Sequence, residues 1–159
     1  MRRLLVIASL LAVAGVLASQ ASAGTTNVSV SMSFTEPILP DIHSGCPTFP
    51  DGFCGTGVVV PFGHATESIA FGGGCLGSCD FRTVNVAGGS IYIDEFFGTG
   101  FCPGACQPNP AEPGGGTLND VVVGGTGIFA GASGNLSGRV YAAAAQSAIK
   151  LSGTITLQS

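Results

Sequence analysis

The sequence predicts an all-β domain of about eight antiparallel strands, with its long loops fastened by disulfides. Three observations predict it: apolar and polar residues alternate along several segments, glycine-rich turns separate short apolar segments, and the chain holds six cysteines. Alternation with a period of two places successive side chains on opposite faces of a strand. Regular short strands joined by such turns are typical of a sandwich or a closed barrel.

The clearest alternation is near the two ends of the domain, at residues 28–35 and 149–158. In both segments one face is apolar and the other carries mainly hydroxyl groups. No segment is a convincing helix. Two segments rich in proline, 36–53 and 98–116, are expected to be long loops, which usually need fixing. Six further strands are expected at 57–60, 64–71, 81–86, 91–96, 117–123 and 136–144.

The first 23 residues have the three parts of a signal peptide. Arg2 and Arg3 form a positive region, residues 4–18 are apolar with one interruption, and small residues lead to a cleavage site after Ala23. The apolar run is shorter than the roughly 20 residues of a membrane-spanning helix, so an uncleaved anchor is the weaker interpretation. We therefore expect a secreted protein with a single domain over 24–159 and no membrane contact after cleavage.

The charge of the chain excludes some classes of partner. Charged residues make up 9% of the chain, far below the roughly 25% of ordinary globular proteins. Once the leader is removed, Arg82, Arg139 and Lys150 are the firm positive charges against nine carboxylates. Three scattered cations cannot neutralise a run of phosphates, so we expect neither nucleic-acid binding nor electrostatic docking on anionic lipid.

A hairpin is expected between residues 81–86 and 91–96. A Gly-Gly pair suits a tight turn that needs positive φ, so we place Gly88-Gly89 at the turn. This register puts Arg82 opposite Glu95, on the same face as two pairs of apolar residues. This register pairs opposite charges with each other and apolar side chains with each other, and such cross-strand pairs favour it.

All six cysteines lie after the leader, and an even number in an exported chain indicates disulfides. The hairpin register places Cys79 opposite Gly98, near the next cysteine-containing loop. The favoured pairing is therefore Cys46–Cys54, Cys79–Cys102 and Cys75–Cys106. The local pairs Cys75–Cys79 and Cys102–Cys106 remain open. The equal spacing within those two local pairs also fits a four-thiolate zinc site, but oxidising surroundings favour disulfides and we expect no metal.

The segment 121–130 has the spacing of a dinucleotide-binding motif, Gly125-x-Gly127-x-x-Ala130. That chemistry needs a helix under the pyrophosphate and an acidic residue about 20 positions later. Three glycines follow within eight residues, and no carboxylate occurs after Asp120. We therefore expect no nucleotide and no other cofactor.

The same segment carries a resemblance to a known family. Residues 124–134 read Gly-Gly-Thr-Gly-Ile-Phe-Ala-Gly-Ala-Ser-Gly and are followed by two expected strands and a Thr-Ile-Thr-Leu ending; a hairpin after Cys79 precedes them. This pattern resembles small exported bacterial proteins similar to the allene oxide cyclase and dirigent barrels, over about residues 55–157. The resemblance implies an eight-stranded antiparallel barrel with an apolar interior. No catalytic residue of those enzymes maps onto this chain, so none is assigned.

Three ionisable residues fall on faces that are otherwise apolar: Glu67, Arg82 and Glu95. If those faces line a barrel, the three form a candidate ligand-binding cluster, and a buried carboxylate among them acts as an acid or base. The favoured interpretation is structural, with Arg82 and Glu95 paired near the rim and Glu67 at the opposite end or outside. His43 and His64 are expected at the surface.

Three functions are compatible with these features. The leading hypothesis is a non-enzymatic secreted barrel that acts through its surface or holds a small apolar ligand. The second is an isomerase or cyclase acting on an unsaturated lipid or phenolic substrate. The third is an envelope or matrix protein that uses its polar surface for interaction. The first two differ in whether ionisable side chains converge beside a cavity.

Overall fold

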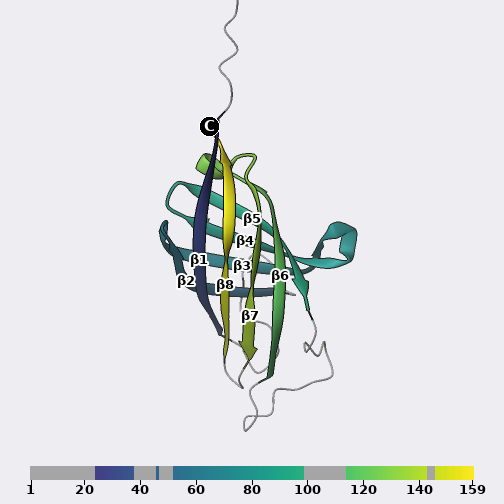
Figure 1. The fold of residues 1–159 in the computed structure, drawn as a ribbon. Helices are drawn as coiled ribbons and strands as arrows, with labels where there is room; N and C mark the ends of the chain where they lie inside the picture. Colours follow the sequence, from purple (N-terminus) through teal and green to yellow (C-terminus); the bar gives the residue numbers. More distant parts are fainter. Residues whose placement is uncertain (1–23, 38–45, 47–51, 99–113, 143–145) are drawn as a thin grey trace, which may run out of the picture.

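The computed structural model describes residues 24–37, 46, 52–98, 114–142 and 146–159. Eight strands account for most of them, with two short 3-10 helices, η1 (Cys75–Gly77) and η2 (Gly127–Phe129). The strands, drawn in Figure 1, are β1 (Thr25–Pro37), β2 (Gly52–Val60), β3 (Gly63–Gly74), β4 (Cys79–Val86), β5 (Gly89–Phe97), β6 (Gly114–Gly125), β7 (Ser133–Ala142) and β8 (Gln146–Gln158).

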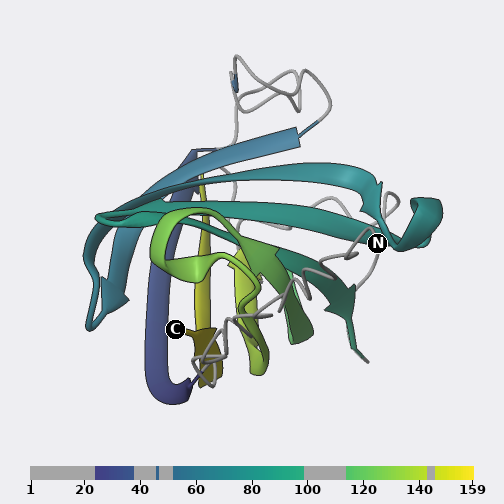
Figure 2. The same cartoon turned by 90° about the horizontal axis from the view of Figure 1, so that it is seen from above.

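The eight strands form a closed barrel in which each strand pairs with its neighbours in sequence. Every pairing is antiparallel, and β1 closes the barrel against β8 over a ladder from Thr25↔Gln158 to Pro37↔Gln146. Figure 2 shows the barrel from above. The predicted fold class is therefore confirmed. Among the described residues, no helix has the length and apolar character needed to cross a bilayer.

The interior of the barrel has an apolar part and a charged part. Alternation along β1 turns Val30, Met32, Phe34 and Glu36 inward, so apolar side chains precede a carboxylate. The apolar part is closed by η2, whose Phe129 is fully buried and meets the ring of Phe62 edge to face at 4.9 Å. The buried apolar core contains Val30, Met32, Phe34, Val59, Ala65, Val84, Ile91, Ile93, Leu118, Val122, Phe129, Ala132, Leu136, Ile149, Leu151 and Ile155.

The predicted register of the β4–β5 hairpin is wrong by two residues. Arg82 lies opposite Ile93, Asp80 lies opposite Glu95, and the turn is Ala87-Gly88. Gly89 lies in β5 and not in the turn. A Cβ at this position would lie 2.0 Å from the carbonyl oxygen of Thr126, so the close approach of the β6–β7 connection requires a glycine here. A shift of two residues keeps every side chain on its predicted face. Arg82 and Glu95 are therefore diagonal neighbours.

The strands also run further into the predicted loops than expected. β1 continues to Pro37, β2 begins at Gly52, and β6 begins at Gly114. The first extension matters for the site, because it places Glu36 in a strand and turns its side chain into the barrel. Apart from Cys46 and Gly98, the remainder of both predicted loops lies outside the described residues, as do the predicted signal peptide and His43.

Two disulfides are present among the described residues. Cys46 is bonded to Cys54, as predicted. Cys75 is bonded to Cys79, so the predicted pairs Cys79–Cys102 and Cys75–Cys106 are wrong. The physical reason is local: η1 folds the β3–β4 connection back so that the Cα atoms of Cys75 and Cys79 are 5.4 Å apart, a separation a disulfide spans. Cys102 and Cys106 themselves lie outside the described part of the chain.

Candidate functional site

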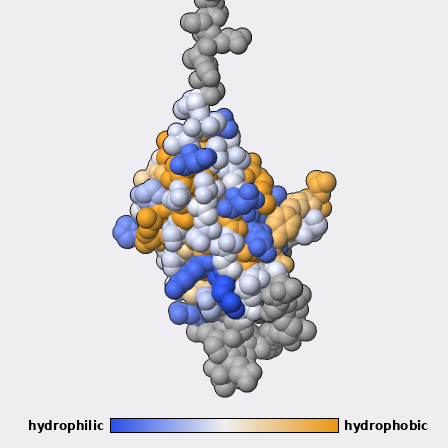
Figure 3. All heavy atoms as spheres, viewed as in Figure 1, coloured by the Kyte–Doolittle hydropathy of each residue, from blue (hydrophilic) through white to orange (hydrophobic). Residues whose placement is uncertain are grey.

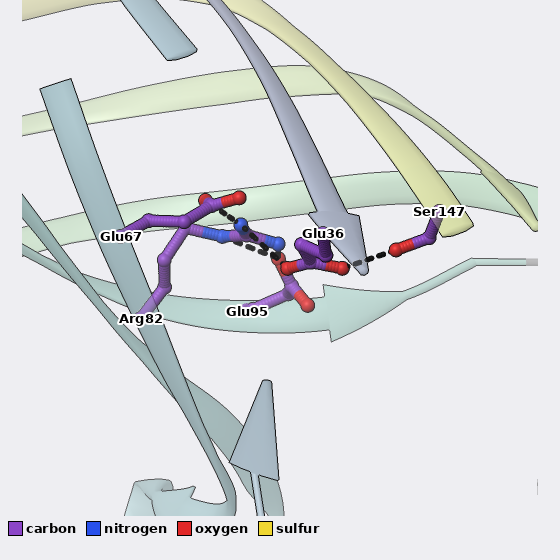
Figure 4. Close-up of polar contacts among 5 residues, drawn as sticks. All are labelled: Glu36, Glu67, Arg82, Glu95 and Ser147. Carbon is purple, nitrogen blue, oxygen red and sulfur yellow. Dashed lines mark hydrogen bonds and ion pairs between the residues drawn. The ribbon is translucent and has the colours of Figure 1, made fainter. Parts of the chain in front are cut away.

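Three carboxylates from three different strands surround one arginine inside the barrel. The Nε of Arg82 on β4 donates to Glu95 Oε2 on β5 at 2.8 Å, and Nη2 donates to the same oxygen. Nη1 donates to Glu67 Oε2 on β3 and lies 3.7 Å from Glu36 Oε1 on β1. Ser147 on β8 donates to the other oxygen of Glu36, as Figure 4 shows. We call Glu36, Glu67, Arg82 and Glu95 the arginine cluster.

The arginine cluster is buried, and of its four residues only Glu95 also lines a surface pocket. Its side chains are 0–3% exposed, and Arg82 is the largest of the fully buried side chains of the described chain. Sequence reasoning placed Arg82, Glu95 and Glu67 on the correct faces and named their convergence as an alternative. The favoured interpretation paired Arg82 with Glu95, and that contact is present, but its placement of Glu67 at the opposite end or outside is wrong. The long side chain of Arg82 on β4 reaches both neighbouring strands, so β3 and β5 each contribute a carboxylate partner.

Sequence reasoning missed Asp120, a fourth buried carboxylate. It lies opposite Glu95 in the β5–β6 ladder and is 2% exposed. Neither of its carboxylate oxygens makes a hydrogen bond of ordinary geometry within the described structure. Burial, reinforced by the charge of Glu95, raises the pKa of Asp120 to about 7. The signal was present, since Asp120 alternates in phase with the buried Leu118 and Val122.

Charges within the arginine cluster do not balance, and the carboxyl groups respond by holding protons. Burial raises the pKa of Glu67 to about 8, although the charge of Arg82 opposes that rise. Burial likewise raises the pKa of Glu36, against the lowering effect of Arg82. Burial alone would lower the pKa of Arg82, but the surrounding carboxylates hold it above its usual range. At neutral pH the site therefore combines a firm cation with a largely protonated Glu67.

A glycine on β2 leaves room for the carboxylates. Gly55 is buried, and a Cβ there would lie 2.6 Å from Glu67 Oε1 and 3.0 Å from Glu36 Cγ. Any side chain at this position would push against the two carboxyl groups. β2, which lies between β1 and β3 and gives no charged group to the cluster, therefore provides the space beside it.

A surface pocket of about 320 Å³ reaches the edge of the arginine cluster. Glu95 belongs to both: one carboxylate oxygen accepts two bonds from Arg82, and the residue also lines the pocket. Asp80, half-buried on the pocket wall, accepts a hydrogen bond from the Gly72 N–H at 2.7 Å, and burial raises its pKa. The pocket is lined by Gly72, Gly77, Ser78, Cys79, Asp80, Glu95, Phe96 and Phe97.

The connection between β3 and β4, which forms part of this pocket, projects from the barrel. Cys75 and Leu76 both have left-handed backbone conformations, with φ of 47° and 57°. Leu76 is completely exposed at the tip. Figure 3 shows this projection as an apolar surface beside the more polar wall of the barrel.

Comparison of the chain with protein families, with characterised proteins and with solved structures finds no match. The resemblance to the allene oxide cyclase and dirigent barrels stays a prediction.

The described residues hold one group with three possible metal-ligating atoms close together: Cys75, Cys79 and Asp94. Because Cys75 and Cys79 share a disulfide, they offer no thiolate to a metal ion. His64, at the start of β3, is exposed as predicted and is not among the residues that line the pocket.

Proposed function

We propose that this protein is a secreted, non-enzymatic binding protein that holds a small ligand in the pocket beside the arginine cluster. One observation carries the proposal: Glu95, a carboxylate buried in the barrel and fixed by Arg82, also lines an open pocket. A buried polar group held in one orientation next to a small cavity is a feature of ligand sites. Its orientation is set before any ligand arrives, which lowers the entropy cost of binding.

The pocket is a better place for the ligand than the centre of the barrel. Val59, Val84, Ile91 and Ile155 are 0% exposed, so no space that a water molecule could enter adjoins them. The apolar part of the barrel is therefore packed by its own side chains. The pocket volume of about 320 Å³ falls at the small end of ligand sites. Phe96 and Phe97, at 39% and 36% exposure, offer apolar surface to the ligand.

Binding is favoured over catalysis because the group best suited to proton transfer is enclosed. The Glu67 side chain is 0% exposed and is not among the residues that line the pocket. A general acid or base must come within hydrogen-bond reach of the reacting group. Glu67 instead contacts Arg82, so it acts on the pocket by holding the arginine.

The proposal is tested on protein purified without denaturant from the medium of its own host. Native mass spectrometry should show a bound small molecule, which is then extracted and added back. We expect Phe96→Ser to lose the bound molecule. Tyr141→Ser, which removes another exposed aromatic ring from β7 that does not line the pocket, should retain it. Equal retention by both variants, or a wild-type mass with nothing bound, contradicts the proposal.

A second candidate is acid–base catalysis by an isomerase or cyclase acting on an unsaturated lipid or phenolic substrate. The observation that favours it is the pair of carboxyl groups, Glu67 and Asp120, whose pKa values of about 8 and about 7 suit proton transfer near neutrality. On this hypothesis Glu67→Gln abolishes turnover while the barrel remains folded. Unchanged turnover or binding in that variant would eliminate it.

A third candidate is interaction with an envelope or matrix, favoured by the projecting β3–β4 connection. Leu76 is fully exposed at the tip, and the projection as a whole presents an apolar surface, a feature of interaction sites (Figure 3). Leu76→Ser should then reduce the fraction of the protein retained by the host cell wall. Equal retention of the variant and the wild type would remove this candidate.

A further inference from the structure

We propose that the ligand of the pocket carries a protonated amine, which lies against Glu95 and Asp80. This inference rests on the proposed function, because it names the chemical class that the same pocket selects. The lining of the pocket contains two carboxylate side chains and no lysine, arginine or histidine. Glu95 already has Arg82 as a partner, but Asp80 makes no ion pair among the described residues, so a neutral ligand would leave the charge of Asp80 uncompensated and an anionic one would be repelled.

The interior behind the pocket lacks positive charge. Four buried carboxyl groups, Glu36, Glu67, Glu95 and Asp120, share a single guanidinium. Asp120 is 2% exposed, faces into the barrel beside Glu95, makes no ion pair among the described residues, and meets the backbone N–H of Phe96. Burial and the charge of Glu95 both disfavour its charged form, so positive charge on this side of the barrel would be stabilising. An ammonium group bound against Glu95 would place a positive charge on the side of the barrel interior where Asp120 lies.

The other described cations cannot supply this charge. Arg139 and Lys150 are exposed and lie opposite each other in the β7–β8 ladder. The guanidinium of Arg139 lies 5.8 Å from the ring centre of Tyr141, on the outer surface of the barrel. Among the described residues no further cation is available, so the negative charge of the carboxylates beside the pocket can be balanced only by bound protons or by a cationic ligand.

An organic ammonium fits the pocket better than a metal ion does. Among the described residues, no set of three carboxylates brings its ligand atoms within 4.8 Å of one another, as a hard divalent cation would require. The two pocket carboxylates are accompanied by Phe96 and Phe97. Aromatic faces beside carboxylates attract an ammonium through its charge and its alkyl groups together.

The test uses three probes of one length: hexylammonium, hexanol and hexanoate. Each is titrated into uniformly ¹⁵N-labelled protein at pH 7.5, and amide shifts give both affinity and location. We expect shifts at Gly72, Gly77 and Ser78, and hexylammonium to bind about tenfold or more tightly than hexanol, as a charge-assisted contact provides. Hexanoate should bind more weakly than either.

Asp80→Asn is the diagnostic variant, because the asparagine oxygen can still accept from Gly72 while the charge is lost. It should bring the affinity for hexylammonium close to that for hexanol. Asp94→Asn is the matched control. Asp94 is next to Glu95 in sequence but does not line the pocket, so this variant should still bind hexylammonium more tightly than hexanol. Glu95→Gln is less informative because it also removes the negative charge that pairs with Arg82.

The outcomes separate this inference from the proposed function. Equal affinity for hexylammonium and hexanol, with shifts at the pocket, overturns the amine preference and leaves the binding pocket intact. Tighter binding of hexanoate overturns it as well. Absence of pocket shifts with all three probes contradicts both proposals. An amine preference that survives Asp80→Asn with no loss in affinity also overturns the assignment.

Discussion

Arg82 is the single positive charge among the buried side chains that the structure describes. Taking a charge out of water costs several kcal/mol, and the cost is offset only when partners satisfy its donors. Here Nε, Nη1 and Nη2 all have carboxylate partners. The arginine in turn pairs with carboxyl groups that would otherwise be unpaired inside the barrel, so the guanidinium and the carboxyl groups stabilise each other.

Replacing Arg82 should therefore destabilise the protein more than the loss of one side chain would suggest. Arg82→Met keeps much of the volume but leaves the carboxyl groups without their cation. We expect the free energy of unfolding at pH 7 to fall by about 3–5 kcal/mol, measured by urea unfolding. Arg139→Met, which removes an exposed arginine, should change it by less than about 1 kcal/mol. Similar losses for the two variants would show that the cluster contributes little.

At this scale the sequence predicted part of the site. The alternating pattern placed Glu67, Arg82 and Glu95 on the faces that the structure turns inward. It could not predict which face was interior, since both faces of a strand alternate equally well. Glu36 was assigned to a loop because the prolines that follow it hid the continuation of β1. Asp120 was not singled out, although its phase matches that of its buried neighbours Leu118 and Val122.

At the scale of elements, the β4–β5 hairpin shows what sequence patterns can and cannot determine. Both strands and their faces were predicted correctly, because alternation depends only on the local chain. The register was not, because the chemistry that fixes it lies elsewhere in the sequence. Gly89 packs against the main chain at Thr126, a segment that no local pattern connects to the hairpin. A glycine needed for close approach was therefore mistaken for a glycine needed in the turn.

This register gives a direct prediction for two neighbouring positions. Gly89→Ala would place its Cβ 2.0 Å from the Thr126 oxygen, with a φ of 150°, so either β5 or the β6–β7 connection must move. We expect a loss of at least about 2 kcal/mol in unfolding free energy, measured by thermal or urea unfolding. Ala87→Ser, in the exposed turn two residues earlier, should be close to neutral. A neutral Gly89→Ala would support the register with the turn at Gly88-Gly89.

For the molecule as a whole, the buried carboxyl groups should make stability depend on pH in an unusual direction. Glu67 and Asp120 have pKa values of about 8 and about 7 in the folded protein, raised from 4.5 and 3.8, and that of Glu36 is raised too. The folded state therefore binds more protons than the unfolded state between about pH 4 and pH 8. By linkage, unfolding free energy falls as pH rises through this range.

We therefore expect the protein to be more stable near pH 5 than near pH 8, with a higher midpoint of urea unfolding. The double variant Glu67→Gln and Asp120→Asn, which is neutral at both sites, should lose much of this difference. A midpoint that rises from pH 5 to pH 8 in the wild type would contradict the assignment of raised pKa values. An unchanged slope in the double variant would place the pH dependence in other groups.

The ladder between β1 and β8 has a consequence for the order in which the protein folds. It joins the first and last described strands over thirteen residue pairs, each more than one hundred positions apart in the chain. Contacts so distant in sequence form slowly, because a long stretch of chain must be ordered first. Until β8 pairs with it, β1 has no partner along one edge, and an open edge invites pairing with other chains. We therefore expect closure of the barrel to be a late step of folding and one that is exposed to aggregation.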